Sequence, residues 1–209
     1  MRNKMSENPD LFACPIVPVL TINTPEQAVP LAETLGKVGF SALEVTFRTA
    51  HAASAIAAMR KACPDLHIGA GTITGAAQFD AACAAGSDFL VSPGTGPTLF
   101  ELFKQATMPV FPGIATPSEA LAAYEQGYKI QKFFPASANG GTAMLKAMSA
   151  PLADISFMPT GGIHRENMQD YLALPNVVSI GGSWMIDADA LAAGDWDKLG
   201  AYAERQIQA

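Results

Sequence analysis

Two ionisable side chains interrupt segments that otherwise have the apolar character of buried strands. Glu44 lies within residues 42–48 (ALEVTFR), and Lys132 lies within residues 129–134 (KIQKFF). Because side chains alternate between the two faces of a strand, Glu44 shares its face with Arg48 and is expected to point inward. A carboxylate or an ammonium buried without a partner costs several kcal/mol, so each of these groups needs a partner or a chemical task.

Lys132 has the surroundings expected of a nucleophile that attacks a carbonyl group. Burial beside aromatic residues disfavours its charged form, and the neutral amine is the species that adds to a carbonyl carbon to form an imine. Two structural explanations account for the same residue: a buried ion pair between Glu44 and Lys132, or a lysine that extends its ammonium to solvent. The spacing alone leaves these interpretations open.

Paired glycines follow two later apolar segments, in TGGI at residues 160–163 and in GGSW at residues 181–184. Backbone N–H groups in glycine loops approach phosphate oxygens closely, and the N-terminus of a following helix adds a favourable dipole. The pattern predicts a phosphorylated substrate, although paired glycines also permit tight turns without any ligand. The candidate phosphate-binding segments are these two glycine loops.

Eight short β-branched or aromatic segments alternate with alanine-rich stretches of helical length. The strands are expected at residues 16–21, 42–47, 67–70, 89–92, 110–113, 129–133, 156–160 and 177–181. Apolar strands of this kind need both faces covered, which predicts an α/β fold, a single-domain (β/α)8 TIM barrel over residues 1–209. Residues 1–14 would form an N-terminal extension and residues 187–209 a C-terminal helix. An open doubly wound sheet is the alternative, but GxGxxG is missing after the first strand.

Local signals mark where several helices begin and end. Thr24 and Thr116 each precede a proline and a polar residue at the reciprocal capping position, which predicts two capped helix starts. Gly39, Gly86 and Gly127 stand a few residues before the next strand, where a left-handed helix end requires glycine.

Composition limits the classes of partner. The 13 Lys and Arg against 19 Asp and Glu give a net charge of −6, which disfavours nucleic acid or an anionic membrane as a partner. The first ten residues lack the apolar stretch of a secretory signal, and no segment approaches the roughly 18 apolar residues of a membrane span. We therefore expect a cytoplasmic protein.

Cysteine and histidine spacing gives no indication of a metal or disulfide framework. Cys14, Cys63 and Cys83 are far apart and form no CxxC motif, so we expect reduced packing residues. The three histidines are also widely spaced, and only His164 follows a strand end. We expect His164 and Arg165 to be exposed residues of a first helical turn, with phosphate contact as the alternative.

Seven motifs occur together in a recognisable order. They are LEVTFRT at 43–49, GAGT at 69–72, SPG at 92–94, PG at 112–113, KFFPA at 132–136, PTGGI at 159–163 and GGSW at 181–184. In this order and spacing they resemble the 2-keto-3-deoxy-6-phosphogluconate (KDPG) aldolase family, which also includes 4-hydroxy-2-oxoglutarate aldolases. The resemblance extends from about Pro18 to Trp184.

The resemblance implies a homotrimeric class I aldolase barrel that needs no metal or cofactor. It implies cleavage of a keto-acid phosphate, KDPG, to pyruvate and glyceraldehyde 3-phosphate in the Entner–Doudoroff pathway. In this family pattern Lys132 would form the Schiff base and Glu44 would be the general acid and base. The remaining roles implied are carboxylate binding by Arg48 and Thr72, a pocket wall of Pro93 and Phe134, and phosphate binding by Gly162, Gly182 and Ser183, beside Gly161.

Two positions depart from the family pattern, and other functions stay possible at this point. Some relatives have an arginine where this chain has Thr21, and many have an acidic residue where it has Ser137. Related aldolases also cleave unphosphorylated 4-hydroxy-2-oxoglutarate. The competing functions are a phosphate-binding barrel isomerase or synthase that uses no covalent intermediate, and a sugar-phosphate-binding module without turnover.

Overall fold

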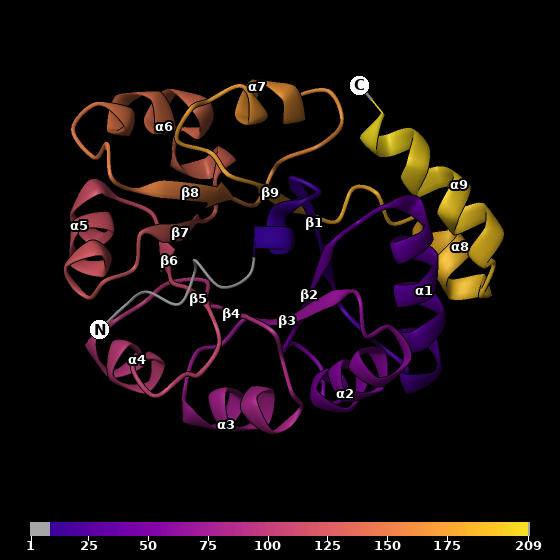
Figure 1. The fold of residues 1–209 in the computed structure, drawn as a ribbon. Coiled ribbons are helices and arrows are strands. Elements are labelled where there is room, and N and C mark those ends of the chain that lie inside the picture. Colours follow the sequence, from indigo (N-terminus) through magenta and orange to yellow (C-terminus); the bar gives the residue numbers. More distant parts are fainter. Residues whose placement is uncertain (1–8, 209) are drawn as a thin grey trace.

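Parallel strands and covering helices alternate around one axis in the computed structural model, which describes residues 9–208 (Figure 1). The strands are β1 (Ile16–Leu20), β2 (Ala42–Thr46), β3 (His67–Gly71), β4 (Leu90–Val91), β5 (Val110–Phe111), β6 (Gly113–Ile114), β7 (Ile130–Phe133), β8 (Ser156–Pro159) and β9 (Ile180–Gly182). The helices are α1 (Ala28–Val38), α2 (Ala52–Ala62), α3 (Ala76–Ala84), α4 (Pro97–Phe103), α5 (Pro117–Glu125), α6 (Gly141–Ser149), α7 (Met168–Leu172), α8 (Ala188–Ala193) and α9 (Trp196–Ile207). Within residues 9–208 the short 3-10 helices are η2 (Pro9–Phe12), η3 (Pro25–Gln27) and η4 (Ser137–Asn139).

Two parallel sheets join into one ring of strands. The first has the order β5-β4-β3-β2-β1-β9, and the second has the order β6-β7-β8. The chain itself connects β5 to β6, and two isolated parallel bridges, Phe157 with Val177 and Thr160 with Gly181, connect β8 to the segment of β9. In Figure 1 the helices form an outer ring, and α9 returns to lie against α1. The predicted (β/α)8 barrel is therefore confirmed.

The fifth predicted strand is divided in two at Pro112. Proline has no backbone N–H, so it cannot donate to a neighbouring strand, although its carbonyl accepts from the backbone N–H of Lys132 at 2.9 Å. Beyond this break Gly113 donates its backbone N–H to Ser92 Oγ at 2.9 Å. A Cβ at Gly113 would overlap the backbone between Ser92 and Gly94, so only glycine permits this close approach.

Apolar side chains form two layers, one on each face of the strands. Leu43 and Val45 belong to the outer layer, between strands and helices, as alternation predicts. The barrel interior holds a smaller cluster that consists of Leu11, Val17, Ala42, Phe89, Val91, Phe111 and Met158. The buried charges that matter for chemistry lie further along the same inward faces.

The 3-10 helix η2 closes the N-terminal end of the barrel. Leu11 is 2% exposed within the interior cluster, and the Phe12 and Phe111 ring centroids are 5.6 Å apart. Ser41 Oγ donates to the Leu11 carbonyl at 3.1 Å and accepts the Cys14 backbone N–H at 3.0 Å. In Figure 1 this indigo turn lies across the centre of the ring. Of the predicted extension over residues 1–14, residues 1–8 lie outside the described residues.

Most predicted helix boundaries are present, with two errors. His164 and Arg165 are exposed, as expected, but they are not in a first helical turn, because α7 begins at Met168. Thr116 and Glu119 form the predicted capping box, and Gly39, Gly86 and Gly127 have φ of +107°, +76° and +96°. The capping box predicted at Thr24 is wrong. Its intended partner, Gln27, instead donates its side-chain amide to the Leu191 carbonyl at 3.2 Å, and Thr24 makes no side-chain cap.

The C-terminal segment from residue 187 contains two helices. Gly194 ends α8 in the left-handed region with φ +66°, and Asp195 caps the start of α9 by accepting the Lys198 backbone N–H at 3.0 Å. Residue 209 lies outside the described residues.

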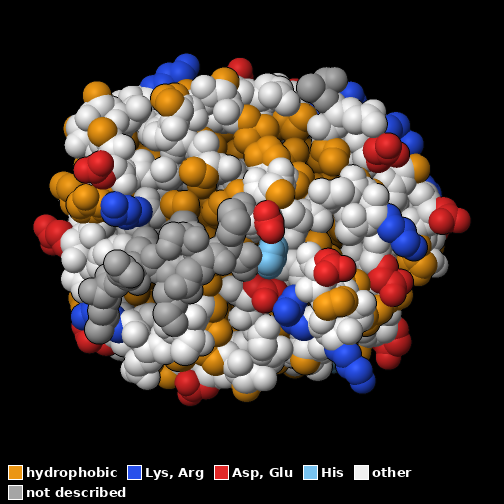
Figure 2. All heavy atoms as spheres, in the orientation of Figure 1, with side chains coloured by type: hydrophobic (Ala, Val, Ile, Leu, Met, Phe, Trp, Pro, Cys, Tyr) orange, Lys and Arg blue, Asp and Glu red, His pale blue; other side chains and the backbone are white. Residues whose placement is uncertain are grey.

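The surface agrees with the charge balance of the sequence. On the face drawn in Figure 2, basic and acidic side chains are interspersed rather than separated by sign. Among the described residues no helix is both long and apolar enough to cross a bilayer. Cys14, Cys63 and Cys83 are all free thiols, as predicted.

The closing role of η2 leads to a stability prediction. Leu11→Ala removes a buried side chain from the barrel interior and should lower the free energy of unfolding by about 2–5 kcal/mol. Leu121→Ala is the matched control, because Leu121 on α5 is 46% exposed and its loss should cost less than about 0.5 kcal/mol. Urea unfolding followed by circular dichroism measures both. Equal effects of the two substitutions would contradict the closing role.

Candidate active site

Glu44 and Lys132 meet inside the barrel. Lys132 Nζ donates to Glu44 Oε1 at 2.9 Å and to Oε2 at 3.3 Å, and the two residues are only 5% and 2% exposed. Glu44 is on β2 and Lys132 is on β7, which are the second and sixth strand units of the ring. The contact therefore spans the barrel interior between opposite walls. The alternative of a Lys132 ammonium extended to solvent is wrong.

Glycines on β3 make room for the Glu44 side chain. Gly69 and Gly71 pair in register with Glu44 and Thr46 of β2. A Cβ at Gly71 would overlap Glu44 Oε1, and a Cβ at Gly69 would overlap the Phe89 ring. The GAGT motif thus provides empty volume beside the carboxylate, a role that the sequence analysis did not assign to it.

Phe134 forms an aromatic wall beside the amine. Lys132 Nζ lies 5.4 Å from the centroid of the Phe134 ring, within the range of a cation–π contact. A Cβ at Gly161 would be 3.4 Å from Phe134 Cε2. The ring therefore lies close to both the amine and the first glycine loop.

The buried pair can carry out proton transfer. It consists of an ammonium and a carboxylate, or of an amine and a carboxylic acid after one proton moves along the 2.9 Å hydrogen bond from Nζ to Oε1. The second form provides the amine that a carbonyl carbon requires, with an acid next to it. The same contact also fits a structural ion pair. The geometry is therefore compatible with both a catalytic and a structural role of the Glu44–Lys132 pair.

Arg48 lies at the mouth of the barrel rather than inside it. β2 ends at Thr46, so strand alternation does not reach Arg48, and its side chain is exposed. The expectation that Arg48 points into the barrel is therefore wrong. Arg48, Thr21 and Ser183 line one cavity of about 280 Å³. This cavity brings a cation and a hydroxyl from distant parts of the sequence together at the mouth.

The two glycine loops lie side by side. The bridge between Thr160 and Gly181 joins their first residues, and a Cβ at Gly182 would be 3.7 Å from the Ile163 carbonyl oxygen. Gly161 and Gly162 have φ of +99° and +73°, a region that favours glycine. Both loops are at the carboxyl ends of their strands, where barrel enzymes bind their ligands.

Thr72 and Pro93 line the rim on the other side of Glu44. Thr72 directly follows Gly71 and adopts φ +63°, which is uncommon for a residue with a side chain. Pro93 is half-buried, and Gly113 packs closely against its backbone. Both residues lie at strand ends, as predicted.

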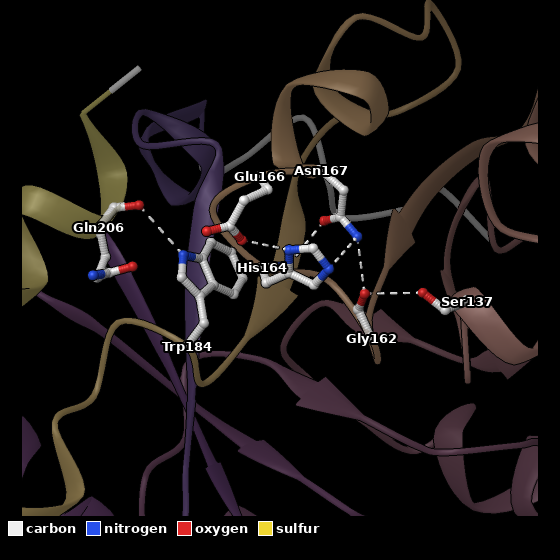
Figure 3. Close-up of polar contacts among 7 residues, drawn as sticks. All are labelled: Ser137, Gly162, His164, Glu166, Asn167, Trp184 and Gln206. Carbon is white, nitrogen blue, oxygen red and sulfur yellow. Dashed lines mark hydrogen bonds and ion pairs between the residues drawn. The ribbon is translucent and has the colours of Figure 1, made fainter.

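The loop after β8 contains a polar network that the sequence analysis missed (Figure 3). Ser137 Oγ donates to the Gly162 carbonyl at 2.9 Å, and Asn167 Nδ2 donates to it at 3.1 Å. His164 Nδ1 lies 2.7 Å from Glu166 Oε2. A hydrogen bond from its own backbone N–H, followed by the His164 bond, lowers the pKa of Glu166. Asn167 lies five residues after Gly162 in a loop, where no periodic sequence pattern singles it out. Its role can be recognised only from its contact in the structure.

A larger cavity lies apart from this site. It has a volume of about 500 Å³ and lies between the loop after β3, the loop after β4 and helix α4, with Glu101 as its ionisable residue. It holds no cation that would bind an acidic substrate. Among the described residues no group of three or more His, Cys, Asp and Glu side chains is arranged to hold a metal ion.

Known proteins match both the fold and the sequence. Residues 9–202 match the family model described as KDPG and KHG aldolase. The chain belongs to this aldolase family. A 2-dehydro-3-deoxy-phosphogluconate aldolase of Dickeya dadantii is 44% identical over 99% of this chain and 98% of its own, and a KHG/KDPG aldolase of Escherichia coli K12 is 43% identical over 100% and 98%.

A solved structure adds direct information on the chemistry of the aldolase family. It is the KDPG aldolase of Legionella pneumophila, with pyruvate captured as a covalent carbinolamine intermediate. The two chains are 40% identical and superpose with a TM-score of 0.89. The match covers 93% of this chain and 94% of the Legionella pneumophila chain.

The space beside Glu44 leads to a prediction about this aldolase site. Gly71→Ala places a Cβ where Glu44 Oε1 now lies, so the carboxylate must move. A crystal structure of the variant should show the Glu44–Lys132 separation beyond about 4 Å, and urea unfolding should show a loss of about 1–3 kcal/mol. Gly36→Ala on α1 is the control, because its Cβ would make an ordinary 3.8 Å contact with Leu66. An unchanged Glu44–Lys132 distance in Gly71→Ala would refute the role of Gly71.

Proposed function

We propose that this protein is a class I aldolase that cleaves KDPG to pyruvate and glyceraldehyde 3-phosphate through an imine on Lys132. The observation that carries the proposal is the buried Lys132 amine, 2.9 Å from Glu44 at the centre of a barrel. The named activity of the Dickeya dadantii relative and the pyruvate adduct of the Legionella pneumophila neighbour support it.

The reaction begins with formation of the imine. After Lys132 transfers a proton to Glu44 or to water, its amine adds to the C2 carbonyl carbon and gives a carbinolamine. Glu44 returns a proton to the C2 oxygen, which leaves as water, and the nitrogen lone pair forms the C=N bond. The protonated imine can then accept an electron pair from the neighbouring bond.

Cleavage and release use the same carboxylate. Glu44 removes the C4 hydroxyl proton, directly or through a water, and the C3–C4 bond breaks as the C4 carbonyl forms. The electron pair moves through C3 to the imine nitrogen, and the aldehyde leaves. A proton from the acid form of Glu44 then adds to C3 of the enamine, and water hydrolyses the imine to give pyruvate and free Lys132.

The rim residues bind the two ends of the substrate in this proposal. Arg48 and Thr72 bind the carboxylate next to the reacting ketone, while Pro93 and Phe134 form the pocket wall. Arg48 also lines the cavity with Ser183, a placement that supports an anion at the mouth. The phosphate is bound by the glycine loops, through Gly161, Gly162, Gly182 and Ser183.

Cleavage of unphosphorylated 4-hydroxy-2-oxoglutarate to pyruvate and glyoxylate is a second candidate activity. The family model and the name of the Escherichia coli relative include KHG, and the imine chemistry needs only the keto-acid end of the substrate. With KDPG as the main substrate, the enzyme acts in the Entner–Doudoroff pathway. The free thiols agree with a cytoplasmic location, since reducing compartments keep cysteines unpaired.

Covalent capture tests the proposed chemistry. Borohydride reduction in the presence of pyruvate, followed by peptide mass spectrometry, should locate an adduct on Lys132. Lys132→Ala should lose the adduct and lower turnover by at least about a thousandfold, because no other group replaces the nucleophile. Lys146→Ala is the matched control, since Lys146 is exposed on α6 and should react like the wild type.

Three outcomes decide between the candidate functions. Glu44→Gln should still form some adduct, while turnover falls by about 10²–10⁴ because proton transfer is lost. Binding of pyruvate without any adduct would exclude the class I mechanism and favour a non-covalent isomerase or synthase. A fully active Lys132→Ala would refute the proposal, and ligand binding without turnover would favour a sugar-phosphate-binding module.

We also expect a homotrimer, on the basis of the family resemblance. Light scattering coupled to size-exclusion chromatography should give three times the 21.8 kDa chain mass. A monomeric mass at micromolar concentration would overturn this expectation.

A further inference from the structure

Two side chains from separate parts of the chain hold one backbone carbonyl. Ser137, at the start of η4, and Asn167, just before α7, both donate to the Gly162 oxygen, at 2.9 and 3.1 Å. Figure 3 shows the two donors converging on this atom. Gly162 is exposed and has φ +73°. Because glycine has no Cβ, its backbone can adopt many conformations, and the direction of this carbonyl depends on its hydrogen-bond donors.

Anchoring the carbonyl determines the direction of the next N–H. The C=O of Gly162 and the N–H of Ile163 belong to one planar trans peptide, in which the two bonds point in opposite directions. Among the described residues, no protein acceptor takes the N–H of Gly162 or of Ile163. The anchored carbonyl therefore turns a free donor away from Ser137 and Asn167.

Asn167 is itself held in one orientation. Its Oδ1 accepts the His164 backbone N–H at 2.9 Å, and its Nδ2 lies 3.1 Å from His164 Nε2. Because Glu166 accepts from His164 Nδ1, the Nε2 atom is left to accept the second hydrogen of the Asn167 amide. Rotation of the amide would break all three contacts of Asn167, so Glu166 and His164 support the anchor.

We propose that Asn167 and Ser137 are positioning residues that preset the Gly162–Ile163 peptide so that the Ile163 N–H donates to the substrate phosphate. This inference rests on the proposed function and adds two residues that do not touch the substrate. A donor fixed before binding needs no ordering when the ligand arrives, which saves binding free energy.

The surroundings of the anchor agree with this role. A Cβ on Gly182 of the second glycine loop would be 3.7 Å from the Ile163 carbonyl oxygen, which belongs to the peptide that follows the preset one. The preset peptide is therefore one residue away from the contact with the second loop. Position 162 also requires glycine, because a Cβ there would overlap Ser137 Oγ. Ser137 supplies a donor that an ionised acidic residue at this position lacks.

Kinetics with and without the phosphate group test the inference. In Asn167→Ala the KM for KDPG should rise about tenfold, and in Ser137→Ala about threefold, because one hydrogen bond to the anchor is lost. The kcat should change less than about twofold. The pyruvate concentration that gives half-maximal borohydride trapping on Lys132 should also change less than about twofold, because pyruvate carries no phosphate.

Ser54→Ala is the matched control, since Ser54 is exposed on α2 and bonds only to the His51 carbonyl. Ser137→Ala keeps Asn167 at the start of α7, although it also removes a 3.5 Å contact with Tyr171 OH, and it keeps the test valid if Asn167→Ala does not fold. A parallel loss in KDPG turnover and pyruvate trapping, or an unchanged KM in both variants, would overturn the positioning role alone. A wild-type protein without KDPG turnover or pyruvate adduct would overturn the proposed function and this inference with it.

Discussion

The buried contact between Glu44 and Lys132 constrains the whole barrel. Each charge would cost several kcal/mol if it were buried alone, so neither residue can be accommodated without the other. The two residues are on opposite walls, and their side chains meet only if the ring closes with β2 and β7 in the correct register. Closure in turn depends on close approaches at Gly113 and Gly71, where any Cβ would overlap neighbouring atoms. The chemistry and the fold therefore require the same glycines.

The two ends of the barrel have different physical tasks. At the N-terminal end, η2 places Leu11 and Phe12 against the interior cluster and seals it with apolar surface. At the carboxyl ends of the strands, exposed loops bring together Arg48, Ser183 and the glycine pairs. The apolar seal and the polar rim thus lie at opposite ends of the barrel.

Sequence periodicity predicts which side chains face inward within a regular strand or helix, and it fails beyond the end of that element. Alternation on β2 correctly separates Glu44 from Leu43 and Val45, because all three lie within the strand. It fails at Arg48, since the strand has ended two residues earlier. Competition explains the error at Thr24: Gln27 binds a carbonyl 164 residues away, which no local pattern indicates. The Gly162 anchor was missed for a similar reason, because Ser137 and Asn167 approach it from two loops without periodicity.

In the proposed function, imine chemistry and phosphate recognition use separate parts of this structure. The buried pair acts on the ketone through side chains that strand register holds in place. In the proposed function, the phosphate is bound by backbone N–H groups of an exposed loop, and two polar side chains, Ser137 and Asn167, hold the Gly162 carbonyl of that loop. A change in the loop can therefore alter the preference between phosphorylated and unphosphorylated keto acids without moving Lys132 or Glu44. Under this proposal, members of one aldolase family can share the imine chemistry and differ in the phosphate end of the substrate.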